Sequence, residues 1–342
     1  MSNQSENNRL KIITTEEHFI SLEISAQYAK ELQELNPHFK NAYNINDKYS
    51  PSIEQLQDIG ELRVADMDKH GIDMQVLSYT SPGTQMLKGD VGVAMAKKAN
   101  DMVAAAINSF PTRFAGFASL PTADPIAAVN ELERCVNELG FTAIMINGRT
   151  DNLFLDHPSF DPLLAAAERL GTPIYIHPTV PPKAVYEAYY DNLEPLVSAR
   201  LSTAGWGWHN EAGIHGVRLI LAGVFDKYPD LQIILGHWGE MATFYLERID
   251  AALTPVASSL QRSVGEYFQS NFYITPSGMW SVPSLLHSIQ IMGADRILYA
   301  VDYPYITQEG ARAFLENAPI SHADKEKIGY KNAASLLRIN TI

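Results

Sequence analysis

Hydrophobic and polar positions near the start of the chain follow the pattern of a buried β-strand. The run Lys11–Phe19 is short, apolar and rich in β-branched residues, and it carries Glu16 and His18 toward its carboxyl end. Side chains alternate along an extended segment, so we expect Glu16 and His18 on one side and Glu17 on the other. Two interpretations remain open at this point: a pair of metal ligands, or acids at the start of a helix beside a packed histidine.

Similar apolar runs recur along the chain, and most are separated by segments with helical spacing. The further expected strands are Met74–Ser78, Arg113–Ala118, Phe141–Ile146, Pro173–Pro178, Leu231–His237, Phe272–Thr275 and Ile297–Asp302. Eight strands alternating with helices predict an α/β protein, a single-domain (β/α)8 TIM-like barrel. An open doubly wound sheet is the alternative, but the first strand is not followed by a Gly-x-Gly-x-x-Gly turn.

One long polar segment, Ile20–Pro51, departs from this alternation. It is rich in Asn, Tyr, Pro and charged residues, and it resembles an elaborated loop with a helix near Ile24–Leu35. Loops of this length in compact domains tend to be lids or binding surfaces, so we expect it to cover the site. Residues 1–10 are predicted to be a flexible N-terminus, and residues 11–342 are predicted to form the barrel.

Composition and charge mainly restrict the partners. The 342 residues are 46% hydrophobic and 19% charged, which is sufficient for a large core. A formal net charge of −13 without a dense Lys/Arg run argues against nucleic acid and against an anionic membrane. The chain shows neither a secretory signal nor an apolar stretch of membrane-spanning length, and its one cysteine, Cys135, cannot form an internal disulfide. We therefore expect a cytoplasmic protein.

Four of the expected strands end in groups that bind metals or transfer protons. Glu16 and His18 belong to the first strand, His177 to the fifth, His237 to the sixth and Asp302 to the eighth. In a barrel these ends converge on one rim, where the active sites of this fold lie. A single histidine is more often a hydrogen-bonded structural residue, but the repetition at strand ends favours a metal site.

The other histidines keep a structural interpretation. His209 lies in the segment Trp206–His209, where it could line a pocket with the tryptophans, but packing is the preferred interpretation. The remaining six lie in loops or on expected helices: His38, His70, His157, His215, His287 and His322.

Four motifs occur in order along the chain: Glu16–Phe19, Ile174–Pro178, Leu235–Glu240 and Leu298–Pro304. Together they resemble the motifs of the metal-dependent decarboxylase branch of the amidohydrolase superfamily, which includes the hydroxybenzoate decarboxylases. The resemblance extends from about Lys11 to the C-terminal helix. The Glu-x-His of the first strand, in place of the His-x-His of many superfamily hydrolases, resembles the benzoate-decarboxylase subgroup.

The resemblance implies a set of roles for these residues. The implied metal ligands are Glu16, His18, His177 and Asp302. His237 and Glu240 match a pair beside the metal, one turn apart if Gly236–His237 opens a helix. The implied catalytic residues are Asp302, His237 and Glu240, with Asp302 or His237 as the proton donor.

Two further residues are predicted to bind the substrate. Arg248 matches an arginine that follows the Gly-His-x-Gly-Glu motif, in a helix that reaches toward a subunit interface in relatives. Its alternative is an ordinary ion pair with Glu247 or Asp250. Phe19 is a candidate for the wall of an aromatic pocket, although core packing explains it equally well.

The reaction that the resemblance implies is the non-oxidative decarboxylation of an ortho-hydroxybenzoate of the dihydroxybenzoate type. It requires one divalent metal ion, zinc or manganese, and no organic cofactor. The implied partners are a small aromatic carboxylate and further copies of the chain in a homodimer or homotetramer. Two alternatives stay open: a metal-dependent hydrolase of an amide, ester or lactone, and a non-catalytic barrel that only binds a ligand or metal.

Overall fold

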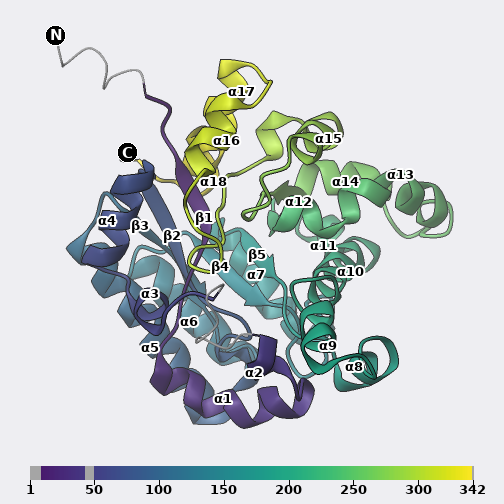
Figure 1. The fold of residues 1–342 in the computed structure, drawn as a ribbon. Helices are drawn as coiled ribbons and strands as arrows, with labels where there is room; N and C mark the ends of the chain where they lie inside the picture. The colour runs from purple at the N-terminus through teal and green to yellow at the C-terminus, as the bar shows by residue number, and fades with distance from the viewer. Residues whose placement is uncertain (1–8, 43–49, 341–342) are drawn as a thin grey trace.

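The sheet of this protein is parallel throughout. A computed structural model describes residues 9–42 and 50–340 (Figure 1), and seven strands of these residues pair in chain order. The strands are β1 Ile13–Phe19, β2 Met74–Tyr79, β3 Phe114–Ser119, β4 Ala143–Asn147, β5 Ile174–His177, β6 Ile233–Leu235 and β7 Phe272–Ile274. Nearly all of their residues are buried, because helices cover one face and the curled sheet encloses the other.

Helices connect the strands and surround the sheet (Figure 1). They are α1 Leu22–Leu35, α2 Phe39–Ala42, α3 Ile53–Gln57, α4 Glu61–His70, α5 Gly89–Ser109, α6 Pro125–Asn137, α7 Asp161–Leu170, α8 Lys183–Tyr189, α9 Pro195–Ser202, α10 Gly207–Leu221, α11 Val224–Lys227, α12 His237–Glu240, α13 Ala242–Leu253, α14 Val264–Asn271, α15 Val282–Met292, α16 Ala311–Asn317, α17 His322–Glu326 and α18 Asn332–Leu336. Their ends follow local signals: Asp124 caps α6 ahead of Pro125, and Gly171 ends α7 in the left-handed conformation.

Alternate residues of each strand pack into two separate hydrophobic clusters. In β4, Ile144 and Ile146 belong to the larger cluster, which lies between the sheet and the helices. Ala143 and Met145 belong to the smaller cluster on the opposite face, which also contains Ala333 of α18 and Leu337 directly after that helix. Figure 1 shows α18 beside β1, so a helix from late in the chain packs against the first strand. Both faces of the sheet are therefore apolar, which fixes the strand register.

The eighth strand, predicted at Ile297–Asp302, does not form as a strand. The segment makes single bridges to its neighbours, Ile274 to Ile297 and Glu17 to Tyr303. The Glu17 carboxylate accepts the backbone N–H groups of Val301 at 3.0 Å and of Tyr303 at 3.2 Å. A side chain thus replaces part of the backbone ladder, and the strand geometry is lost at Asp302, whose φ is 67°.

The first described residues, Arg9 and Leu10, contact the rest of the protein, and the predicted boundary at residue 10 stays a prediction. Residues 1–8 of the predicted flexible N-terminus lie outside the described residues. Leu10 is only 9% exposed and packs in the larger cluster, while the Arg9 side chain pairs with Asp73. Packing against the barrel therefore begins before Lys11.

Candidate active site

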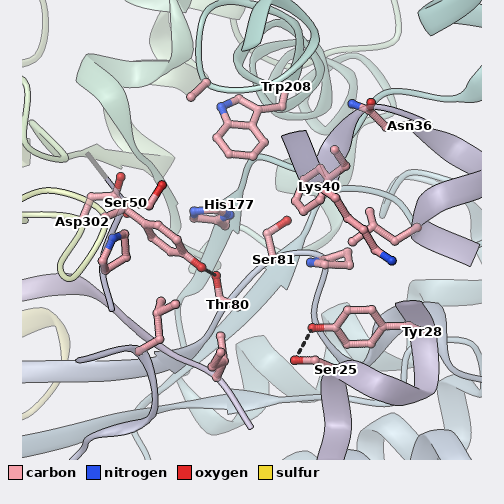
Figure 2. Close-up of a pocket in the computed structure, with 18 of the residues that line it drawn as sticks. Ser25, Tyr28, Asn36, Lys40, Ser50, Thr80, Ser81, His177, Trp208 and Asp302 are labelled. Carbon is pink, nitrogen blue, oxygen red and sulfur yellow. Dashed lines mark hydrogen bonds between the residues drawn. The ribbon is translucent and has the colours of Figure 1, made fainter. Parts of the chain in front are cut away.

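A cavity of about 370 Å³ opens at the carboxyl ends of the strands. His177 at the end of β5, His237 after β6 and Asp302 all line it. The opposite wall comes from α1, which contributes Tyr28 and Leu32. Figure 2 shows His177 and Asp302 on one side of the cavity and Tyr28, with its hydrogen bond to Ser25, on the other. Described residues of the segment Ile20–Pro51, which was predicted to cover the site, thus line the cavity, while residues 43–49 of that segment lie outside the described residues.

Four acidic and imidazole groups converge beside this cavity. They are the predicted ligands Glu16, His18, His177 and Asp302, and one ligand atom of each lies within 4.8 Å of the others. His177 Nε2 is 3.4 Å from Glu16 Oε1, and His18 Nε2 is 3.4 Å from Asp302 Oδ1. Glu16 Oε1 and His18 Nε2 are buried and have no hydrogen-bond partner. Buried polar atoms are seldom left unpaired, so this group fits a cation bound between its members.

The outward-facing atoms of these groups are held by other residues. The Nδ1–H of His177 donates to the Pro178 carbonyl at 2.7 Å, which leaves Nε2 as the free lone pair. His18 Nδ1 pairs at 3.0 Å with the Ser78 hydroxyl, from the residue opposite it on β2. Both histidines therefore present Nε2 to the interior of the group, as ligating histidines do.

Glu16 is fixed in the same way. The hydroxyls of Tyr175 and Ser277 both donate to its Oε2, so Oε1 is the oxygen that faces His177. Burial raises the pKa of Glu16 and lowers the pKa of His177 well below its usual value. Burial thus disfavours the charged carboxylate and keeps the imidazole neutral. A divalent cation between Glu16 and His177 would stabilise the charged carboxylate, and the neutral imidazole would be free to bind the cation.

A second group, which we call the His–Glu–His cluster, consists of His237, Glu240 and His209. His237 Nδ1 lies 2.8 Å from Glu240 Oε1, and His209 Nδ1 lies 2.8 Å from Glu240 Oε2. The side chain of Glu240 is fully buried between the two rings. Each oxygen of the Glu240 carboxylate is therefore hydrogen-bonded to one histidine ring.

The charges in this cluster stabilise one another. Burial lowers the pKa of His237, but the Glu240 and Glu16 carboxylates outweigh burial and raise it to about 10. Burial raises the pKa of Glu240, but His237 and His209 outweigh it and lower the pKa to about 2. These shifts favour an imidazolium at His237 paired with a carboxylate at Glu240.

The backbone of His237 and Glu240 forms the expected helical turn, α12, but with the opposite hand. Residues 237–241 all have positive φ, from 47° at His237 to 84° at Gly239, so the turn is left-handed. The turn begins after Gly236, as expected, but it is left-handed because tertiary hydrogen bonds hold this conformation: Trp238 N–H donates to the Thr275 carbonyl at 2.7 Å, and His237 N–H donates to Ser277 Oγ at 3.1 Å. The predicted contact of His237 with Glu240 forms all the same.

Sequence reasoning missed three members of the site. His209 was interpreted as packing, yet it binds Glu240. Tyr175 lies two residues before His177 on β5, and strand alternation would have placed it on the same face. Ser277 follows β7 without any pattern that marks it as functional.

The two predicted substrate contacts lie elsewhere. Phe19 is fully buried in the core with its ring edge-on to Tyr79 at 5.4 Å, because alternation in β1 turns it away from His18. It does not line the cavity, so the geometry supports packing for Phe19. Arg248 is exposed on α13, and among the described residues it forms no ion pair with Glu247 or Asp250. Its contact with substrate stays a prediction.

Several of the remaining histidines have structural surroundings. His215 accepts the Leu155 N–H at 3.0 Å, and His287 stacks on Phe244. Within the described ranges, the helices are all too short or too polar to cross a lipid bilayer.

Comparisons with known proteins agree with this geometry. A family model described as amidohydrolase matches residues 18–339. The chain is 37% identical to a gamma-resorcylate decarboxylase of Polaromonas sp. over 311 residues, which are 86% of this chain and 93% of that protein.

Solved structures give the same result. A dihydroxybenzoic acid decarboxylase from Polaromonas sp. with bound manganese and the inhibitor 2-nitroresorcinol has a TM-score of 0.83 at 35% identity, over 97% of this chain and 98% of that one. A 5-carboxyvanillate decarboxylase from Novosphingobium aromaticivorans, complexed with manganese and 4-hydroxy-3-methoxy-5-nitrobenzoic acid, has a TM-score of 0.85 at 34% identity, over 98% and 97% of the two chains.

Proposed function

The chain belongs to the amidohydrolase family, and we propose that it is a metal-dependent carboxy-lyase that decarboxylates an ortho-hydroxybenzoate of the dihydroxybenzoate type without oxidation. The observation that carries this proposal is the pair of buried, unpartnered atoms Glu16 Oε1 and His18 Nε2, which lie beside a cavity that His237 also lines. The relatives named gamma-resorcylate and dihydroxybenzoic acid decarboxylase support the substrate class.

The ligand set suits one divalent ion, manganese or zinc, because it mixes two carboxylates with two imidazoles. Held by Glu16, His18, His177 and Asp302, the ion would orient the substrate through its carboxylate and its ortho oxygen. An organic cofactor is not part of the proposal.

The protein itself must deliver a proton. The ring carbon that bears the carboxylate gains the proton, and the electron pair of the broken C–C bond then restores the aromatic ring as carbon dioxide leaves. Two donors line the cavity, His237 and Asp302. Glu240 stabilises the protonated form of His237, which suits it to hold a proton at neutral pH. Asp302 could act only if it were protonated away from the metal.

The proposal extends to the assembly and surroundings of the chain. We place the protein in the cytoplasm as a homodimer or homotetramer, with segment 297–303 completing an eight-stranded barrel between β7 and β1. Arg248 would contact a substrate held by a neighbouring subunit. The exposure of Phe244 and Tyr245 on the same helix, at 56% and 61%, supports an interface there.

The test is turnover by purified, manganese-loaded protein. We expect carbon dioxide release from 2,6-dihydroxybenzoate, with deuterium from heavy water at the carbon that lost the carboxylate. High bicarbonate should drive carboxylation of the phenol at that position. Because 4-hydroxybenzoate lacks an ortho oxygen, it should turn over poorly. Equal turnover of the ortho and para acids would exclude chelation, and lactone hydrolysis without decarboxylation would favour the hydrolase alternative.

A further inference from the structure

The Glu240 carboxylate is hydrogen-bonded on two sides, by His237 and by His209. Of these two residues, only His237 has been given a role in the proposed reaction. His237 lines the cavity and binds Oε1 of Glu240. His209 binds Oε2 from the opposite side, and it projects from α10, which is separate in sequence from the turn that carries the other two residues. A fully buried carboxylate with one unbound oxygen would be costly, so His209 completes its hydrogen bonding.

The surroundings of His209 determine which nitrogen faces Glu240. Its Nε2 lies 3.0 Å from Trp208 Nε1 and 3.1 Å from the Ala204 carbonyl. Trp208 can only donate, so the neutral imidazole carries its proton on Nδ1. In the doubly protonated imidazole, Nε2–H donates to Ala204 and Nδ1 is still protonated. In both forms Nδ1–H donates to Glu240 Oε2.

The helix that carries His209 is shaped for this approach. Gly213 lies four residues further along α10, on the same face of the helix. A Cβ atom at Gly213 would lie 2.5 Å from the Glu240 carbonyl oxygen, which is closer than two such atoms can pack. The missing side chain therefore lets α10 lie against the left-handed turn and brings His209 within hydrogen-bond distance of Glu240.

From these contacts we propose that His209 is a positioning residue for the decarboxylation. Its Nδ1–H fixes the Glu240 carboxylate so that Oε1 meets His237 Nδ1, and this leaves His237 Nε2 as the ring nitrogen available to the cavity. The inference rests on the proposed function, because it assigns His237 to the proton transfer. It makes no use of the four predicted metal ligands. The His–Glu–His cluster is itself a group of residue types that could hold a second metal ion, and the test below includes that outcome.

The test compares three substitutions at one position. In His209→Asn the side-chain amide can replace the Nδ1–H donor, whereas in His209→Gln it replaces Nε2 and in His209→Ala nothing replaces it. We expect kcat to fall roughly 10- to 100-fold in the Ala and Gln variants, with KM within about twofold and unchanged metal content, and to return to within about threefold in the Asn variant. Asn210→Ala, the next position on α10, is the matched control.

A second measurement separates this inference from the proposed function. In zinc-loaded protein with ¹⁵N-labelled histidine, the Nδ1–H resonance of His237, assigned with His237→Asn, should shift in His209→Ala and keep its position in His209→Asn. This signal reports the Glu240 contact even if no benzoate is decarboxylated. Four outcomes would each overturn the assignment. They are equal activity of the Gln and Asn variants, wild-type kcat in His209→Ala, an unchanged His237 resonance in His209→Ala, and the loss of a second bound metal when His209 is replaced.

Discussion

Two groups of buried carboxylates and imidazoles lie at the same end of the sheet, and they are built differently. The predicted metal ligands, which we call the ligand group, are Glu16, His18, His177 and Asp302. Its facing atoms lie 3.4 Å apart in two pairs, and Glu16 Oε1 and His18 Nε2 have no hydrogen-bond partner. In the His–Glu–His cluster both oxygens of Glu240 accept a ring N–H at 2.8 Å. The first group is incomplete without a cation, whereas the second is complete by itself.

Both groups contain residue types that could hold a metal ion, so pairing rather than residue type is the basis on which we assign the metal to the first group and the proton donor to the second. The orienting hydrogen bonds of the ligand group lie on the outside: Pro178 and Ser78 hold the histidines, and Tyr175 holds Glu16. Those of the His–Glu–His cluster point inward, to one carboxylate. Unpaired nitrogen and oxygen atoms that face one another fit a bound metal ion, and a carboxylate between two rings stabilises a protonated imidazole.

The largest expected effect follows from opening the ligand group. His177→Ala removes one imidazole ligand, so the protein should lose its metal and, with it, several kcal/mol of transition-state stabilisation, or roughly a thousandfold in kcat/KM. Elemental analysis and turnover on the same sample measure both losses. His322→Ala, which removes an exposed histidine on α17, is the control. A variant that keeps its full metal content would show that His177 is not a ligand.

A smaller effect should follow from breaking the His–Glu–His cluster. Glu240→Gln removes the charge that favours protonated His237, so kcat should fall about 100-fold while the metal stays bound. Metal content by elemental analysis and kcat from carbon dioxide release test this. Glu247→Gln, an exposed glutamate on α13, is the matched control. Loss of metal in Glu240→Gln would show that Glu240 contributes to metal binding and that the two groups do not have separate roles.

The positions of most strands could be predicted from the sequence, because each strand is marked by its own run of residues. Buried strands such as β2 and β4 are continuous apolar runs between helices, and the expected segments overlap the observed strands. The eighth strand is not confirmed. Its segment makes backbone hydrogen bonds to both neighbouring strands, such as Leu298 N–H to the Ile274 carbonyl at 2.9 Å, but part of its ladder is taken by the carboxylate of Glu17, more than 280 residues earlier. An apolar run cannot show that a distant side chain replaces its ladder.

The site could be predicted only in part for the same reason. The four predicted ligands lie at or near the carboxyl ends of strands, where the curled parallel sheet brings them together. His209 has no such signal, because its role depends on how closely α10 approaches the turn at Glu240. The left-handed conformation of residues 237–241 likewise depends on hydrogen bonds from the segment after β7.

A third prediction tests whether the outer hydrogen bonds of the ligand group matter. Tyr175→Phe removes one of the hydroxyls that hold Glu16 Oε2, so metal affinity should fall roughly 10- to 100-fold, and saturating metal should restore much of the activity. A competition titration with a fluorescent chelator measures the affinity. Tyr273→Phe on β7, which is partly exposed, is the control. Unchanged affinity would mean that Ser277 alone orients Glu16.

The smallest expected effect on activity concerns a histidine that has an unpaired atom but no facing ligands. His215 Nδ1 is buried without a hydrogen-bond partner, while Nε2 accepts the Leu155 N–H. No metal-type group of the described residues includes His215. An unpaired buried atom therefore indicates a metal site only where other ligands converge on it. We expect His215→Gln to leave kcat and metal content unchanged, because the side-chain oxygen of glutamine can accept the hydrogen bond that His215 Nε2 accepts.

The same substitution should change the pH dependence of stability. Burial lowers the pKa of His215 to about 3, against an unfolded value of about 6.5. Between these values the unfolded chain binds a proton that the folded chain excludes, so the free energy of unfolding should fall as the pH falls, by up to about 1.4 kcal/mol per pH unit from this residue. Glutamine does not titrate, so His215→Gln should lose less stability than the wild type between pH 6.5 and 4.5 in urea unfolding, measured as the difference between the two proteins at each pH. If the two proteins showed the same dependence of stability on pH, His215 would bind its proton equally well in the folded and the unfolded chain. Its unpaired Nδ1 would then have a partner that the present contacts do not provide.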